Sequence, residues 1–100
     1  MALNYRVTIV TTTPYNVAND DEVIMSNVAG PSSIVLPVTG GGGEKRAVYI
    51  KDYSGQSLQN PITITSAGGK TIDGVSFALL NGGYSHIQIV YDGTNWKTIA

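Results

Sequence analysis

The sequence contains no cysteine, a single histidine and few charged residues. The absence of cysteine excludes disulfide bonds and thiolate metal ligands. Charged residues make up 13% of the chain and the net charge is −1, whereas about a quarter of the residues are charged in typical domains. The six basic residues form no stripe, so we expect neither nucleic acid nor an anionic membrane as a partner. The surface must therefore be uncharged and polar, or be buried against other chains.

Long apolar segments are also missing. No run approaches the roughly 20 apolar residues of a membrane span. The first ten residues, MALNYRVTIV, place Arg6 inside their apolar stretch, which is not the pattern of a signal peptide. A chain of 100 residues has room for one hydrophobic core, so we expect a single β domain over residues 1–100.

The sequence does contain strand patterns, in which β-branched apolar residues alternate with polar ones between glycine-rich turns. These segments are residues 5–12, 22–26, 32–37, 45–53, 61–65, 84–91 and 96–99. Residues 75–80, VSFALL, fit either a strand or one helical turn. The turn DGTN predicts a terminal hairpin. We therefore predict an all-β fold, a compact sandwich or prism-like module of short antiparallel strands and glycine turns.

A small sheet protein of this kind has exposed strand edges. Natural proteins cover such edges by closing the sheet or by pairing it with copies of themselves. Because the chain has little charge to oppose self-association, we expect a homo-oligomer.

The segment SAGGKTIDG, residues 66–74, contains the GGKT with which a phosphate-binding P-loop ends. A P-loop also needs a glycine five positions before Gly69 and a helix that starts at Lys70. Ile64 stands at the first position, and Asp73 with Gly74 signals a turn. We predict a glycine turn between two strands, and no nucleotide or other cofactor.

Other candidates for chemistry are weak. His86 is an isolated histidine, which is more often a surface or interface residue than a catalytic base. Asp20, Asp21 and Glu22 lack the glycine and the spacing of a calcium loop, so a solvated turn is the simpler interpretation. We expect no metal site and no enzyme.

Three further aspartates, Asp52, Asp73 and Asp92, precede glycine or serine-glycine and are explained as turn residues. Aromatic residues offer a carbohydrate-stacking platform, although aromatic side chains on strands are more often core or subunit contacts. They are Tyr49, Tyr53, Tyr84, Tyr91 and Trp96.

The order of sequence blocks in the second half resembles a known module. SIVLP is followed by a glycine-rich loop, then AVYIKDYSGQSLQNPITIT, then KTIDG, then YSHIQIVYDGTNWKTI. This succession, over residues 15–100, is similar to a β-structured module of tailed-bacteriophage virion proteins. The module occurs in tail-fibre tips, head fibres and small capsid decoration or cement proteins. Residues 1–13 lie outside it, as an N-terminal strand or arm.

The resemblance implies an all-β module that often works as a homotrimer, without catalysis and without cofactors. Its signature residues are scaffold positions, and no catalytic residue transfers from the family. In this chain they are Ile50, Lys51, Asp52 and Gly55, then Asn60, Pro61, Ile62 and Ile64, then Thr71, Ile72, Asp73 and Gly74, and finally Tyr91, Asp92, Gly93 and Trp96.

Taken as a stand-alone module, the chain is expected to be a capsid decoration or cement protein. It would be made in the host cytoplasm, bind the major capsid protein on the outer surface of the head, and stabilise the shell by repetition at many sites. The expected shell contacts are residues 1–13 and the flexible loop 40–43, in particular Leu3, Tyr5, Arg6, Gly41 and Gly42. A plain edge strand and a solvated loop stay open as the other interpretation.

The alternative is a tail-fibre or head-fibre tip that binds host surface glycan through Tyr84, Tyr91 and Trp96, or a tail accessory protein. A glycan hydrolase ranks last, because the sequence offers no pair of carboxylates placed in a groove.

Overall fold

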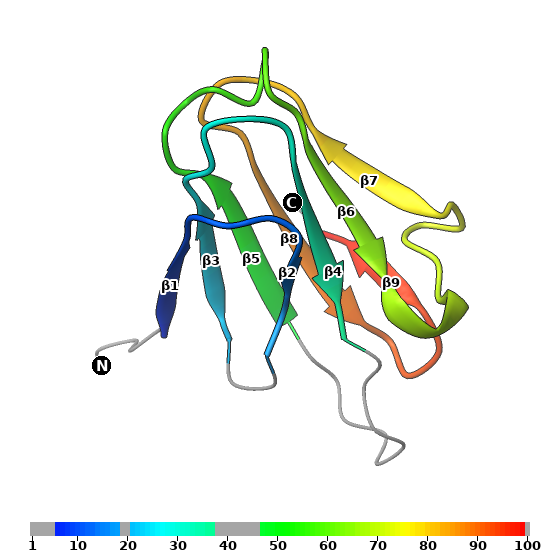
Figure 1. Cartoon of the computed structure of the whole chain (residues 1–100). Helices are drawn as coiled ribbons and strands as arrows, with labels where there is room; N and C mark the ends of the chain where they lie inside the picture. Colours follow the sequence, from blue (N-terminus) through cyan, green and yellow to red (C-terminus); the bar gives the residue numbers. More distant parts are fainter. Residues whose placement is uncertain (1–5, 19–20, 38–46, 100) are drawn as a thin grey trace.

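A computed structural model of the chain describes residues 6–18, 21–37 and 47–99 and shows two β-sheets packed face to face (Figure 1). Sheet A has five strands in the order β1-β3-β5-β8-β9, and sheet B has four in the order β2-β4-β6-β7. The strands are β1 (Val7–Val10), β2 (Tyr15–Asn16), β3 (Val23–Ser26), β4 (Ser32–Leu36), β5 (Ala47–Asp52), β6 (Ile62–Ser66), β7 (Phe77–Leu80), β8 (His86–Tyr91) and β9 (Trp96–Thr98). The predicted all-β fold is confirmed.

The first six strands alternate between the two sheets. β1, β3 and β5 lie side by side in sheet A, and β2, β4 and β6 do so in sheet B, so that each sheet begins with parallel strands. A parallel pair needs a long crossover between its strands, and here each crossover is a strand of the opposite sheet. The chain therefore winds through three coils before β7, β8 and β9 add antiparallel pairs (Figure 1).

The prediction of antiparallel strands is wrong for four of the seven strand pairs in the described part of the chain. Alternating side chains show that a segment is a strand with two faces, but they do not show the direction of its neighbour. The predicted hairpin is confirmed, because β8 and β9 are antiparallel neighbours. Of the two structures that fit segment 75–80, the strand is observed, over residues 77–80. The two-residue strand β2 was not predicted.

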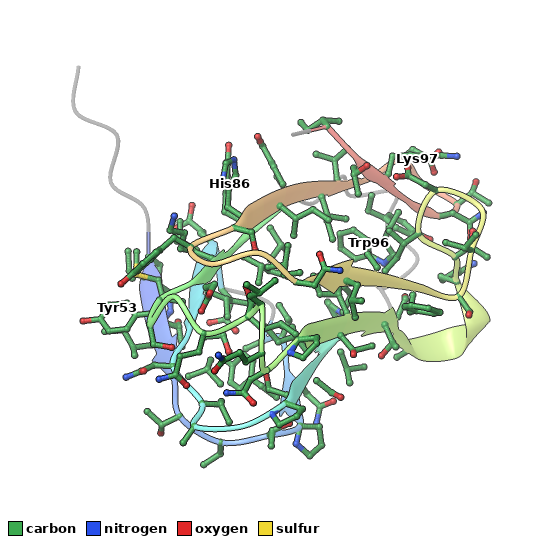
Figure 2. All side chains as sticks on the ribbon, turned by 90° about the horizontal axis from the view of Figure 1, so that it is seen from above. Tyr53, His86, Trp96 and Lys97 are labelled. Carbon is green, nitrogen blue, oxygen red and sulfur yellow. The ribbon has the colours of Figure 1, made fainter. Side chains whose placement is uncertain are left out.

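Inward-facing side chains of both sheets form one hydrophobic core. Isoleucines supply much of it, with Ile24 and Ile50 from sheet A and Ile34 and Ile64 from sheet B all fully buried. Trp96 is 0% exposed and lies between the two sheets (Figure 2). Burying a large aliphatic side chain contributes about 1.5–3 kcal/mol, and an aromatic one has still more apolar area to bury.

Residues 71–73 cover the outer edge of β9. The Trp96 backbone N–H donates to the Thr71 carbonyl at 2.9 Å, and the Asp73 N–H donates to the Trp96 carbonyl at 3.0 Å. An uncovered edge would leave these groups open to pairing with another chain. The preceding residues Ala67–Gly69 form a short 3₁₀ turn, and Lys70 is extended instead of opening a helix. The predicted glycine turn is confirmed.

Four connections meet at one end of the sandwich. Strands β1, β3 and β5 run in the opposite direction to β2, β4 and β6, so the connections that follow them lie at the same end as the β7–β8 connection. These connections are residues 11–14, 27–31, 53–61 and 81–85 (Figure 1). We call this end the tip. The described residues include no helix that is long and apolar enough to span a bilayer.

Trp96 is expected to be a main source of stability. Trp96→Ala should lower the free energy of unfolding by about 3–5 kcal/mol, because it removes a large buried ring and leaves a cavity. Trp96→Phe should cost clearly less, since the indole Nε1 has no hydrogen-bond partner among the described residues. Urea unfolding followed by circular dichroism measures both values. Equal losses for the two variants would contradict this role of ring packing.

Candidate functional site

Asp52, the last residue of β5, is a buried carboxylate that joins two loops of the tip. Its Oδ2 accepts hydrogen bonds from the backbone N–H groups of Ser57 at 2.9 Å and Tyr84 at 3.0 Å. Its Oδ1 accepts one from the Gly55 N–H at 3.2 Å. The side chain is only 2% exposed, so these donors replace the water that the charge has lost. Asp52 therefore holds the β5–β6 and β7–β8 connections together.

Ser57 adds a second tie between the same two loops. Its side chain is 1% exposed, and its hydroxyl donates to the carbonyl of Gly82. The same oxygen lies 3.2 Å from the hydroxyl oxygen of Ser85. The N–H of Asp52 donates to the Ser85 carbonyl at 2.9 Å. The base of the tip is thus a closed polar network.

Tyr84 occupies an unusual backbone conformation at this network. Its φ is +59°, a left-handed value that is costly for a bulky side chain. Gly55 has a φ of +79°, and a Cβ at that position would lie 2.4 Å from the Tyr84 ring. Lys51 Nζ donates to the Tyr84 carbonyl at 2.5 Å and lies 5.9 Å from the ring centroid. Gly55 thus lies against one side of the ring, and Tyr84 as a residue is 61% exposed.

A second buried carboxylate, Asp21, holds the acidic turn before β3. Its Oδ1 accepts from the Thr8 hydroxyl at 2.9 Å, and its Oδ2 accepts from the Tyr15 hydroxyl at 2.6 Å and the Ala18 N–H at 2.8 Å. Asp21 is 3% exposed, so the expectation of a solvated turn is wrong for this residue. Asp20 lies outside the described residues. Within those residues no three His, Cys, Asp or Glu side chains are grouped as a metal site.

Asp73 and Asp92 confirm the prediction of turn residues. Asp92 Oδ1 accepts from the N–H groups of Thr94 and Asn95, both at 2.9 Å, and so shapes the hairpin turn. Asp73 accepts from the N–H of Thr98 at 3.1 Å and from the hydroxyl of the same residue. Each aspartate therefore fixes a turn to its neighbouring strand.

The buried aspartates are stable as anions. Burial alone would raise the pKa of Asp52, but the hydrogen bonds from Ser57, Tyr84 and Gly55 outweigh it and hold the pKa below the ordinary value of 3.8. Burial likewise opposes ionisation of Asp21, and hydrogen bonds led by that of Tyr15 again hold its pKa below 3.8. Both groups thus act as charged acceptors within the scaffold.

The expectation of core contacts is confirmed for Tyr91 and Trp96, and the alternative of a glycan platform of Tyr84, Tyr91 and Trp96 is wrong. Tyr91 is 7% exposed and Trp96 is 0% exposed, and their ring centroids lie 5.2 Å apart in the core. Their hairpin turns both rings inward, away from any external ligand. Tyr84 precedes β8 at the tip, whereas Tyr91 ends β8 at the other end of the sandwich. Of these three residues, Tyr84 alone is exposed, and Tyr53 of the initial aromatic set is exposed as well, at 47%.

Of the predicted shell contacts, Leu3, Tyr5, Gly41 and Gly42 lie outside the described residues. Arg6 is exposed directly before the edge strand β1, and its N–H donates to Glu22 Oε1 at 2.8 Å.

The outer face of sheet A is partly apolar. Val7 and Ile9 of β1 are about half exposed, at 51% and 52%. In register, Val7 lies beside Val23 of β3, and Ile9 lies beside Met25. His86 and Lys97 point outward from the same sheet, away from the core (Figure 2). Apolar side chains therefore gather at the β1 side of this face, whereas the β9 side carries both polar side chains and the exposed Ile99.

The tip also has a small pocket that sequence reasoning missed. Its volume is about 190 Å³, and it is lined by Gly55, Gln56, Leu58 and Gln59. The signal in the sequence was the stretch GQSLQN, which places amide side chains around a leucine in a glycine turn.

No model of a known protein family matches the sequence, and no curated protein matches it either.

Asp52→Asn should lower the free energy of unfolding and make that free energy less dependent on pH in the acidic range. The native pKa is depressed, so the stabilisation is complete above about pH 5 and is lost as the pH falls through the native pKa, below 3.8. At pH 7 we expect a loss of about 1–3 kcal/mol, because an amide cannot accept with both of its polar atoms. Urea unfolding between about pH 7 and pH 2 measures this.

Asp92→Asn is the matched control, because both bonds of Asp92 go to Oδ1, which asparagine retains. Because Asp92 is exposed, the loss of stability at pH 7 should be clearly smaller than that of Asp52→Asn. If Asp92→Asn lost as much stability as Asp52→Asn, the loss could not be explained by the need for both carboxylate oxygens of Asp52 to accept hydrogen bonds.

Gly55→Ala should be coupled to Tyr84. We expect it to cost about 2 kcal/mol or more in the wild type, from the left-handed φ and the contact with the ring, and about 1 kcal/mol less in a Tyr84→Ala background. Gly74→Ala is the control, since its φ is +82° but no atom lies within 4 Å of the added Cβ. A double-mutant cycle by urea unfolding should show coupling for Gly55 and none for Gly74.

Proposed function

We propose that the chain is a structural virion protein of a tailed bacteriophage, and specifically a capsid decoration or cement protein. The observation that carries this proposal is the ordered series of sequence blocks over residues 15–100. The acids in three of these blocks, Asp52, Asp73 and Asp92, each accept the hydrogen bonds that hold a turn. Such residues maintain a scaffold, which supports a structural role better than a catalytic one.

The outer face of sheet A supports docking on a larger protein surface. Its apolar patch on β1 and β3 contains Val7 and Ile9, which would gain stability on burial. Arg6 stands at the start of the same edge strand. We propose that this patch binds the major capsid protein. Interfaces of about 800 Å² per partner, repeated over the shell, would stabilise capsomer contacts without any one being tight.

Self-association is part of the same proposal. β7 is an edge strand of sheet B, and its outward side chains Phe77 and Leu79 are exposed together with Val75 just before it. Segment 75–80 contains no charge or proline of the kind that protects edge strands. These features support a homo-oligomer, for which the family resemblance implies a trimer.

The alternative is a tail-fibre or head-fibre tip, or a tail accessory protein. The pocket beside Tyr84 favours a fibre tip, because such proteins carry their binding site on loops at one end of a rigid body.

The test is the copy number of the chain in purified particles of the phage that encodes it. A cement protein should approach the copy number of the major capsid protein, by quantitative mass spectrometry. A trace amount would contradict the proposal and favour the fibre tip.

The docking surface is tested by adding recombinant protein to particles that lack it. Val7→Asp should reduce binding at least about tenfold, since it places a charge in the apolar patch. Ile99→Asp is the matched control, because Ile99 is exposed to a similar degree, 58% against 51%, but follows β9 at the edge of sheet A opposite to β1. Co-sedimentation measures both. Equal binding by the two variants would contradict the assignment of the patch.

A further inference from the structure

We infer that the tip carries a saccharide-binding site, formed by the exposed ring of Tyr84 and the amide side chains of Gln56 and Gln59. The site is the pocket of about 190 Å³ beside the Asp52 network. Its surface differs from the patch on sheet A, so saccharide binding does not depend on the proposed attachment to a shell.

The pocket and the ring are neighbours through Gly55. This residue lines the pocket, and it also lies directly against the Tyr84 ring, which a Cβ would approach to 2.4 Å. Leu58 supplies a further apolar surface and is 72% exposed. Gln56 and Gln59 line the same pocket and are exposed. The small hollow thus combines an aliphatic side chain and two amides, and the Tyr84 ring lies beside it, across Gly55.

The loop that forms the pocket is held in place from inside. Gly55 and Ser57 donate their N–H groups to Asp52, so the charge beneath the loop fixes its path. The N–H groups of Gln59 and Asn60 both donate to the Gln56 carbonyl, at 3.1 Å and 2.8 Å. These hydrogen bonds hold the loop backbone at Gly55, Ser57, Gln59 and Asn60 before any ligand binds, which lowers the entropic cost of taking up a ligand.

Tyr84 has a side chain that the fold does not require. Its backbone N–H and carbonyl serve Asp52 and Lys51, and any residue provides these groups. Glycine or asparagine would adopt φ +59° at lower cost than tyrosine. The ring nevertheless stands 61% exposed at a strained position. Strained residues that present their side chains to solvent are concentrated at binding sites.

The chemistry of the pocket fits a neutral sugar. A pyranose has one face of C–H groups, which packs on an aromatic ring, and a rim of hydroxyls, which amides recognise as both donors and acceptors. The four lining residues carry no charge, which disfavours an ionic ligand. The volume lies below the roughly 300 Å³ of typical drug-sized pockets, so it suits one sugar unit of a longer glycan. We expect mM affinity per site, raised by multivalency on a particle.

The test is an NMR titration of the ¹⁵N-labelled chain. The probes are the methyl glycosides of glucose, galactose, mannose, rhamnose and N-acetylglucosamine, each added to about 50 mM, well above the expected dissociation constant. We expect at least one to shift the backbone resonances of Gly55, Gln56 and Tyr84 while those of β9 stay unchanged. Tyr84→Ala should weaken this binding about tenfold, and Tyr84→Phe should retain most of it.

Ile99→Ala is the matched control, because it removes an apolar side chain that is 58% exposed, lies beside Gln88 of β8 and does not line the pocket. Its affinity should equal that of the wild type. If Tyr84→Ala does not fold, Gln59→Ala provides the same comparison, with an expected loss of about fivefold. The inference is overturned if no probe shifts the tip resonances, or if the shifts persist unchanged in both pocket variants.

Discussion

The charge of Asp52 is the constraint on which the tip depends. A carboxylate buried at the end of β5 must find hydrogen-bond donors, and it finds them in the backbone of two loops that are distant in sequence. Gly55 must lack a side chain because the Tyr84 ring lies against it, and Ser57 is buried because it donates to the second loop. One ionised group thereby determines the conformation of both loops, and with it the shape of the pocket.

The residues that stabilise the fold differ from those on the proposed binding surfaces. Aspartates, which in many proteins do chemistry, are used here as internal acceptors, and the core is built from isoleucine, valine and Trp96. The two surfaces proposed to bind partners carry mainly uncharged side chains, apolar on β1 and a mixture of ring and amide at the tip. Such surfaces suit contacts that are individually modest and gain strength from repetition on a large particle.

Local patterns predicted most strands and turns, whereas long-range pairing was not predictable. The alternation around Ile50 and Ile64 identified β5 and β6, and the Asp-Gly turn at Asp92 identified the hairpin. Side chains alternate in the same way in parallel and in antiparallel strands. The alternation therefore does not predict the coiled order in which the strands pair. The spacing between Asp52 and Gly55 predicted a turn at Asp52. The hydrogen bond from the Tyr84 N–H to Asp52 joins residues 32 positions apart, and no local pattern predicts it. The alternation within WKTI leaves open which face of β9 is buried, so both a core position and an exposed platform fit Trp96 until the second sheet is placed against it.

The central place of β8 in sheet A bears on how the protein is made. β8 lies between β5 and β9, so the backbone edge of β5 that pairs with β8 stays unpaired in a nascent chain until residues 86–91 have emerged from the ribosome. An open strand edge of this kind is a site for aggregation, and pairing over such separations is slow. Synthesis in large amounts would then favour rapid completion of the C-terminal hairpin, or a chaperone that shields β5 in the interval.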